Sequence, residues 1–183
     1  MFFVLLNSQA FCQELAFTNE NIKFRLTRTY FYVDGTYWFV NLSDHETTRL
    51  IYYPLPTIDQ SDTIDSVDIF NITEGTRPEI SSKTKSGFSF ILSLRNHDSV
   101  IYHIAYRQKV SGDSAVYILR STQAWNQPLK SAEYMLHVDD AIDVTTFSYD
   151  PDKTYDIAGR RYYLWKRDDF MPAKDFVVHF KLR

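Results

Sequence analysis

Residues 30–56 read YFYVDGTYWFVNLSDHETTRLIYYPLP, and this stretch decides the predicted fold. It contains an apolar run, the pair Asp34-Gly35, a second apolar run, a polar loop and a third run that ends at Pro54 and Pro56. Asp-Gly between apolar runs is a strong hairpin signal, because both central residues of a type I′ turn need positive φ. We therefore predict a β-hairpin that turns at Asp34-Gly35 and nucleates a sheet.

Outward from this stretch, apolar and polar residues keep alternating. Ile22, Phe24 and Leu26 alternate with polar neighbours, which is typical of a half-buried strand. No window of a dozen residues has the apolar period of a helix. The sequence thus predicts an all-β protein, an antiparallel β-sandwich of immunoglobulin-like or jelly-roll-like type with little helix. We expect about ten strands, at 22–26, 30–40 (the hairpin), 49–53, 88–94, 100–110, 115–119, 133–138, 142–149, 160–166 and 176–182.

The composition is that of a globular protein with an aromatic core. The chain has 183 residues, of which 44% are hydrophobic and 16% aromatic, enough for one domain with a sizeable core. We expect that domain at 13–183, with a division into two lobes near 75–87 as an alternative. Its 20 basic and 23 acidic residues are mixed along the chain. Because no basic block stands out, we expect no nucleic-acid partner.

The first twelve residues resemble a truncated export signal. Residues 2–6 are apolar, and Ala10 and Cys12 are small residues two apart, as a signal peptidase requires before a cut at Gln13. No basic residue precedes the apolar run, and the run is short, which indicates a start codon placed too far downstream. Lipid attachment at Cys12 and an ordinary first strand are the alternatives. The run cannot span a bilayer, so we expect an exported protein of the periplasm, cell surface or extracellular space.

Five short motifs occur in a familiar order: YWFVNLS, IYYPLP, IAYRQ, STQAWNQPL and FMPAKDFVVHF. With them the chain resembles secreted bacterial β-sandwich proteins known only as domains of unknown function. That family has Phe-x-Asn, Tyr-Pro-x-Pro, Tyr-x-Gln, Thr-x-x-Trp-x-x-Pro and Phe-x-Pro in this order. The resemblance covers residues 22–182 in patches and implies an exported all-β domain without transferable chemistry. The matching residues are Phe39, Asn41, Tyr53, Pro54, Pro56, Tyr106, Gln108, Thr122, Trp125, Pro128, Phe170 and Pro172.

The sequence contains no pattern that identifies a reaction. It has no nucleophile elbow, no zinc-protease motif and no phosphate-binding loop. The histidines lack ligand spacing, and the predicted strands turn His103, His137 and His179 away from the apolar face. Asp150, Asp152, Thr154 and Asp156 occupy alternate positions as in the start of a calcium loop, but the glycine and the final glutamate of such a loop are missing. We expect no catalytic residue, no metal and no cofactor.

Aromatic residues near loops are the candidate ligand-binding residues, because exposed rings stack on sugars or anchor proteins. These residues are Trp125, Tyr155, Trp165 and Phe170. We predict a non-catalytic module with a structural or binding role at the cell envelope, where another envelope protein or a glycan is the partner. A carbohydrate-binding module with coplanar exposed aromatic rings is the alternative, and a hydrolase comes third.

Overall fold

The computed structural model describes residues 14–57, 64–110, 112–158 and 160–183. The predicted export signal, with Cys12, lies outside these residues. Over the described part, the chain forms thirteen strands and one short 3-10 helix. The strands belong to three sheets, one of seven strands and two of three. The all-β sandwich predicted from the sequence is confirmed.

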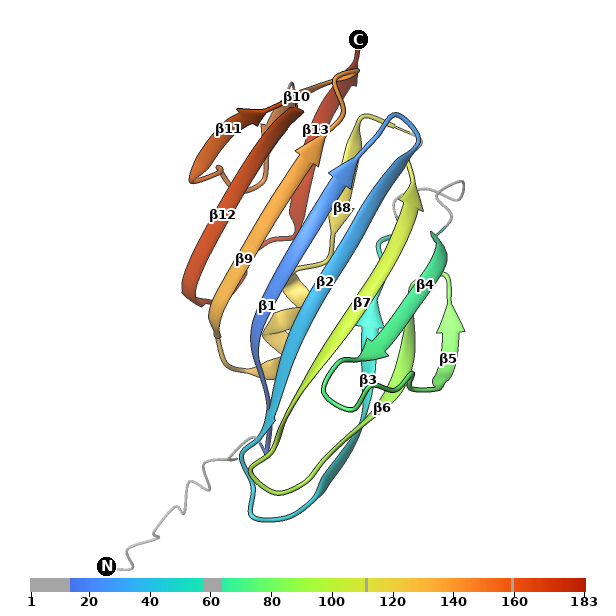
Figure 1. Cartoon of the computed structure of the whole chain (residues 1–183), viewed down its shortest axis with the longest axis vertical. Coiled ribbons are helices and arrows are strands. Elements are labelled where there is room, and N and C mark those ends of the chain that lie inside the picture. Colours follow the sequence, from blue (N-terminus) through green and yellow to red (C-terminus); the bar gives the residue numbers. More distant parts are fainter. Residues whose placement is uncertain (1–13, 58–63, 111, 159) are drawn as a thin grey trace, which may run out of the picture.

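The seven-stranded sheet forms one layer of the sandwich and faces the viewer in Figure 1. All neighbouring strands in it are antiparallel, as expected for an antiparallel β-sandwich, except β1 and β9, which run parallel. Its order is β11 (Lys153–Ile157), β12 (Arg160–Phe170), β9 (Leu129–Val138), β1 (Leu15–Leu26), β2 (Tyr30–Asn41), β7 (Ser99–Lys109) and β4 (Ile64–Asn71).

Two small sheets form the second layer, behind the large sheet in Figure 1. One has the order β10 (Ile142–Phe147), β13 (Phe176–Leu182) and β8 (Ser114–Tyr117). The other has the order β3 (Thr47–Pro54), β6 (Gly87–Leu94) and β5 (Ile80–Thr84). The 3-10 helix η1 (Arg120–Trp125) follows β8 and lies behind the lower part of β1 and β9. The second layer therefore consists of two separate sheets.

The core between the layers is strongly aromatic. Phe24 on β1 stacks on Phe31 at 5.3 Å and on Phe176 at 4.7 Å between ring centroids. Trp165 meets Phe176 edge-on at 4.9 Å. Buried hydrophobic residues before and after segment 75–87 belong to one cluster. This continuous apolar interior is the main source of stability, because each fully buried large side chain contributes about 1.5–3 kcal/mol.

The structure overturns the predicted turn at Asp34-Gly35. Strand β2 runs straight through both residues, and the hairpin with β1 turns at residues 27–29 instead. Asp34 is opposite Lys23 on one side and Ala105 on the other, so it sits in the middle of the sheet. The odd-numbered residues from Phe31 to Phe39 are all buried, so the alternation of buried and less buried residues continues through Asp34-Gly35 without a shift. This alternation outweighs the local preference of Asp-Gly for a turn.

Gly35 has a packing role in place of the predicted turn. A Cβ atom at this position would lie 2.2 Å from the hydroxyl oxygen of Tyr37 and 2.5 Å from its Cζ atom. Residues i and i+2 of a strand share a face, so the ring of Tyr37 folds back over Gly35. The missing side chain of Gly35 thus creates the space that Tyr37 occupies.

Candidate functional site

A cavity of about 780 Å³ lies at the seam between the two small sheets. The large sheet forms its floor, with Phe17 and Phe39 among the lining residues. Strand β3 contributes Ile51 and its neighbours, and Trp125 of η1 lines it as well. Most of the lining is apolar or aromatic, which is typical of pockets for small organic molecules.

Glu20 is the one acidic group buried in this cavity among the described residues. Its side chain points inward because strand β1 changes phase at a bulge between Phe17 and Asn19. Beyond the bulge the even-numbered residues Glu20, Ile22 and Phe24 face the core. The residue is 3% exposed, although carboxylates are rarely buried without a partner.

Tyrosine hydroxyls surround the carboxylate of Glu20. Tyr134 on β9 donates a hydrogen bond to Oε1 at 2.5 Å, and Tyr117 on β8 donates one to Oε2 at 3.3 Å. The hydroxyl of Tyr37 lies 2.7 Å from that of Tyr53 on β3 and 3.2 Å from that of Tyr117. Strands β9 and β8 therefore deliver hydroxyl groups to one buried acid, and the hydroxyls of Tyr37 and Tyr53 continue the network from Tyr117. In the described residues, neither lysine, arginine nor histidine forms an ion pair with it.

Burial without a cation changes the protonation of this group. It raises the pKa of Glu20 to about 7, and the hydrogen bonds from Tyr134 and Tyr117 oppose this rise only in part. Burial also raises the pKa of both tyrosines well above 10, and the nearby charge of Glu20 adds to the effect. Near neutral pH the tyrosines stay neutral while Glu20 is divided between its acid and its carboxylate form.

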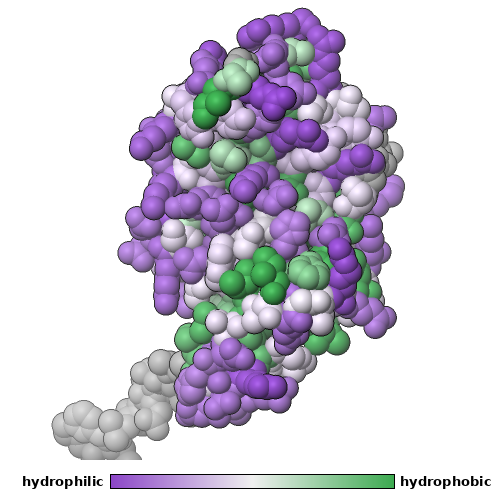
Figure 2. Space-filling model, in the orientation of Figure 1, coloured by the Kyte–Doolittle hydropathy of each residue, from purple (hydrophilic) through white to green (hydrophobic). Residues whose placement is uncertain are grey.

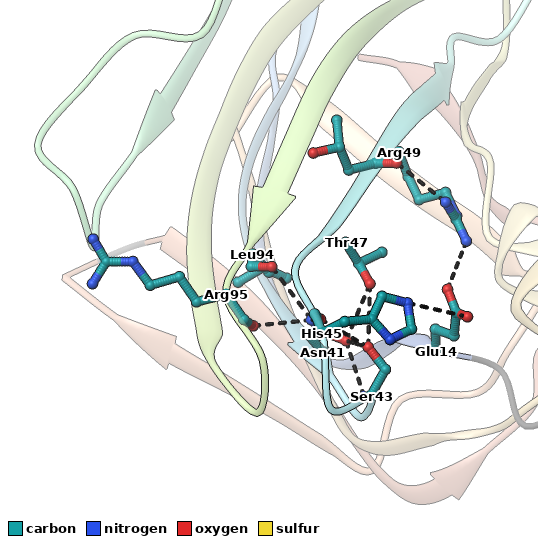
Figure 3. A network of polar contacts seen from close by, with 9 residues as sticks. Glu14, Asn41, Ser43, His45, Thr47, Arg49, Leu94 and Arg95 are labelled. Carbon is teal, nitrogen blue, oxygen red and sulfur yellow. Dashed lines mark hydrogen bonds and ion pairs between the residues drawn. The ribbon is translucent and has the colours of Figure 1, made fainter.

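A polar cluster of Glu14, His45 and Arg49 lies at the mouth of the cavity (Figure 3). Glu14 lies at the start of β1 and accepts a hydrogen bond from Arg49 of β3 at 2.8 Å. The Nε2 atom of His45 lies 3.5 Å from the other carboxylate oxygen of Glu14. Both Glu14 and Arg49 line the cavity, and both are partly exposed. Charged groups therefore meet solvent at the mouth, whereas Glu20 is held in the interior.

Asn41 fixes the loop that carries this mouth. The residue is fully buried, and its amide nitrogen donates to the carbonyl oxygens of His45 at 2.7 Å and of Arg95 at 2.9 Å. Its side-chain oxygen accepts hydrogen bonds from the backbone and the hydroxyl of Ser43. The asparagine of the Phe-x-Asn motif thus ties the loop between β2 and β3 to the end of β6.

Of the four candidate aromatic residues, the structure places only Trp125 at the cavity. It is half-buried and packs against Phe17 and Phe39, with ring centroids 5.8 Å and 5.5 Å away. Trp165 is 2% exposed and donates a hydrogen bond to the carbonyl oxygen of Tyr149, so it is a core residue. Phe170 meets the ring of Tyr149 edge-on at 5.7 Å.

Tyr155 lies on the outer face of the large sheet. Its ring is parallel to that of Tyr162 at 5.3 Å, and His137 stacks on Tyr162 at 5.1 Å. The lining of the cavity includes none of these three residues. The part of this face seen in Figure 2 is mostly hydrophilic, with scattered hydrophobic residues that are most prominent in its lower half. The four candidates therefore do not form one site.

The described residues contain no group of three or more His, Cys, Asp and Glu side chains placed to hold a metal ion. Two of the three acidic residues in the loop that resembles a calcium site form ion pairs. Asp152 binds Arg167 at 2.6 Å, and Asp156 binds Arg161 at 3.1 Å. Among the described residues there is also no helix long and apolar enough to cross a membrane.

The chain matches no protein-family model and no curated protein. Its fold is nevertheless found in solved structures. A candidate nutrient-binding protein from Legionella pneumophila superposes with a TM-score of 0.68 and 13% identity over 91% of this chain and 67% of that chain. An M1 zinc metallopeptidase from Deinococcus radiodurans gives a TM-score of 0.54 and 11% identity over 91% of this chain. This chain covers only 42% of the metallopeptidase. These likenesses show a shared fold.

Sequence reasoning missed Glu20 and its four tyrosines as site residues. A signal for Glu20 was present, because the alternation of Ile22, Phe24 and Leu26 extends back to position 20 and places an acid on the buried face. A buried acid in an otherwise apolar stripe is the informative exception in a strand. The tyrosines gave no such signal, because a tyrosine within a strand is equally typical of plain core packing.

Proposed function

We propose that this chain is an exported, non-catalytic β-sandwich module that binds a small, mostly apolar molecule in the cavity between its sheets. The observation that carries this proposal is the cavity of about 780 Å³, which combines aromatic walls with one buried carboxyl group. Pockets for small molecules typically have about 300–1,000 Å³ and a few convergent polar groups with shifted pKa values. Protein interiors are normally close-packed, so a space of this size is not required for the stability of a β-sandwich.

The arrangement of acids favours binding over catalysis. Hydrolysis by carboxylates needs two of them at a fixed separation across the reacting bond, or a nucleophile beside a base. In the described lining, Glu20 is buried and Glu14 is held at the mouth in an ion pair with Arg49. No serine or cysteine donates a hydrogen bond to Glu20, whose donors among the described residues are tyrosines.

The likeness to the candidate nutrient-binding protein of Legionella supports a binding role for this fold. The location at the cell envelope rests on the sequence of residues 2–12, which resembles an export signal. Another envelope protein or a glycan would meet the hydrophilic outer surface of the module, separately from the cavity.

Binding of a neutral aromatic probe tests the proposal. N-phenyl-1-naphthylamine fluoresces strongly in apolar surroundings, so we expect saturable enhancement with one site per chain. Ile51→Trp adds a large ring to a residue that lines the cavity, and we expect the affinity to fall about tenfold or more, which corresponds to about 1.4 kcal/mol.

Ile91→Trp is the matched control for this substitution. Ile91 lies on β6, the strand paired with β3, but is 54% exposed on the outer side of the same small sheet. We expect this variant to bind the probe as the parent does. An absence of saturable binding in the parent, or equal affinities in the two tryptophan variants, would rule out the cavity as the binding site.

A further inference from the structure

The geometry of the cavity points to a cationic amine as the head group of its ligand, bound by the carboxylate of Glu20. This inference rests on the function proposed above and specifies the chemistry of the same site. The ligand would have one protonated amine attached to an apolar or aromatic body. Its head would reach Glu20, and its body would lie along the aromatic walls toward the mouth.

The first support is the missing partner of the buried acid. In the described residues, the carboxylate of Glu20 receives hydrogen bonds from Tyr134 and Tyr117 but no charge compensation. A buried carboxylate is costly unless a cation pairs with it. A ligand amine would supply the positive charge, and its N–H groups would donate to the remaining lone pairs of both carboxylate oxygens.

The second support is the aromatic lining. Phe17, Phe39 and Trp125 pack together with centroid separations of 5.2–5.8 Å, and all three line the cavity with Tyr37. Aromatic rings attract cations through their negative faces, and the attraction grows as water is excluded. The same rings pack well against an apolar body. They thus favour an amine with a hydrocarbon tail over a compact, fully polar cation.

An anionic ligand fits less well. The one arginine in the described lining is Arg49, which already pairs with Glu14 at 2.8 Å at the mouth. A carboxylate pushed further inward would meet Glu20 and be repelled by it. The position of the charges therefore selects positive head groups in the interior.

The titratable groups that face Glu20 are few, which makes the pH dependence of amine binding informative. The buried tyrosines near Glu20 are Tyr37, Tyr53, Tyr117 and Tyr134, and burial raises their pKa values well above 10, so they stay neutral. At the mouth the charged or titratable groups are Glu14, His45 and Arg49. Alkyl amines keep their charge below about pH 10. Between pH 5.5 and 8, ionisation inside the cavity therefore belongs to Glu20.

The test compares two probes of equal shape, 4-phenylbutylamine and 4-phenylbutan-1-ol, by isothermal titration calorimetry on the full chain. At pH 8 we expect the amine to bind about tenfold or more tightly than the alcohol, a difference typical of a buried charge pair. At pH 5.5, where Glu20 with a pKa of about 7 is mostly protonated, we expect the affinity for the amine to be about 30-fold lower than at pH 8.

Glu20→Gln keeps the shape of the side chain and the groups at the mouth but removes the charge. We expect this variant to lose the preference for the amine and its pH dependence, whereas Glu79→Gln, at an exposed position, should retain both. If the parent binds the two probes equally, or if the pH dependence persists in Glu20→Gln, the amine inference is wrong while the binding function stands. If neither probe binds the parent, the binding function fails as well.

Discussion

Glu20→Gln is expected to gain about 2–3 kcal/mol of stability relative to the parent when the pH is raised from 5 to 8. The parent carries a carboxyl group whose pKa is raised from its usual 4.5 to about 7 by burial. Because the folded state holds this proton more tightly than the unfolded state, the contribution of Glu20 to stability is fully present below about pH 4.5. It is lost as the pH rises through 7. The glutamine of the variant does not titrate, so its contribution to stability does not change with pH.

The size of this effect follows from the pKa difference. A difference of about 2.5 between folded and unfolded states amounts to about 3 kcal/mol in full, at about 1.36 kcal/mol per pKa unit. Most of it falls between pH 5 and 8. It is a large share of the total of about 5–15 kcal/mol that is typical of a folded domain.

Urea unfolding of both proteins at the two pH values measures this quantity directly. Glu79→Gln is the matched control, because Glu79 is exposed and its substitution should leave the pH dependence of the parent in place. Parallel stability–pH curves for the parent and Glu20→Gln would show that the acid is not held in the interior as described.

A second large effect is expected from Gly35→Ala, which should destabilise the protein by about 3 kcal/mol. The added methyl group would overlap the ring of Tyr37, whose hydroxyl oxygen lies 2.2 Å from the Cβ position. Overpacking of this kind costs about 1–3 kcal/mol. Displacing Tyr37 would also remove its hydrogen bonds with the hydroxyls of Tyr53 and Tyr117, and unsatisfied buried groups cost a further 1–3 kcal/mol or so.

Two comparisons isolate the contact between Gly35 and Tyr37. Gly112→Ala is the control, because no atom lies within 4 Å of the Cβ position there, and its midpoint should stay close to that of the parent. In a Tyr37→Ala background the overlap is gone, so Gly35→Ala should cost much less than in the parent, with a coupling of about 2 kcal/mol. Equal urea midpoints for Gly35→Ala and Gly112→Ala would contradict the packing role of Gly35.

The strands of this fold could be predicted from the period of two, because burial on one face leaves a pattern that needs no knowledge of the partner strand. Ile22, Phe24 and Leu26 are buried as predicted, and so are Phe88, Phe90, Leu92 and Leu94. Strand partners could not be predicted in this way. The parallel pair of β1 and β9 joins residues more than a hundred positions apart, and nothing local in either strand encodes it.

The positions of the apolar residues on either side of Asp34-Gly35 also indicate a continuous strand there instead of a turn. A two-residue turn there would pair Val33 with Thr36 and would put Phe31 and Val33 on the opposite face from Tyr37 and Phe39. All four are buried on one face in the structure, which only a straight strand allows. The turn preference of the two residues Asp34 and Gly35 conflicts here with the apolar alternation of the surrounding strand. The burial of four apolar side chains outweighs that turn preference.

The cavity is formed by tertiary contacts between residues far apart in the chain, and local sequence patterns do not predict such contacts. Glu20 meets Tyr117 and Tyr134, which lie 97 and 114 residues further along the chain. The aromatic candidates were chosen because they lay outside strand interiors, whereas the polar groups of this site are tips of side chains within strands. Trp125 was chosen because it lay in a predicted loop, and in the structure it lies on η1, which follows β8, and lines the cavity.

The most direct test of a ligand-binding cavity built around Glu20 is a carbon-13 NMR titration of the glutamate carboxyl groups, with and without 4-phenylbutylamine. We expect one glutamate, assigned through Glu20→Gln, to titrate near pH 7 in the free protein, and its apparent pKa to fall when the amine binds. A Glu20 signal that titrates near 4.5 and does not respond to the probe would contradict both the buried acid and its role in binding.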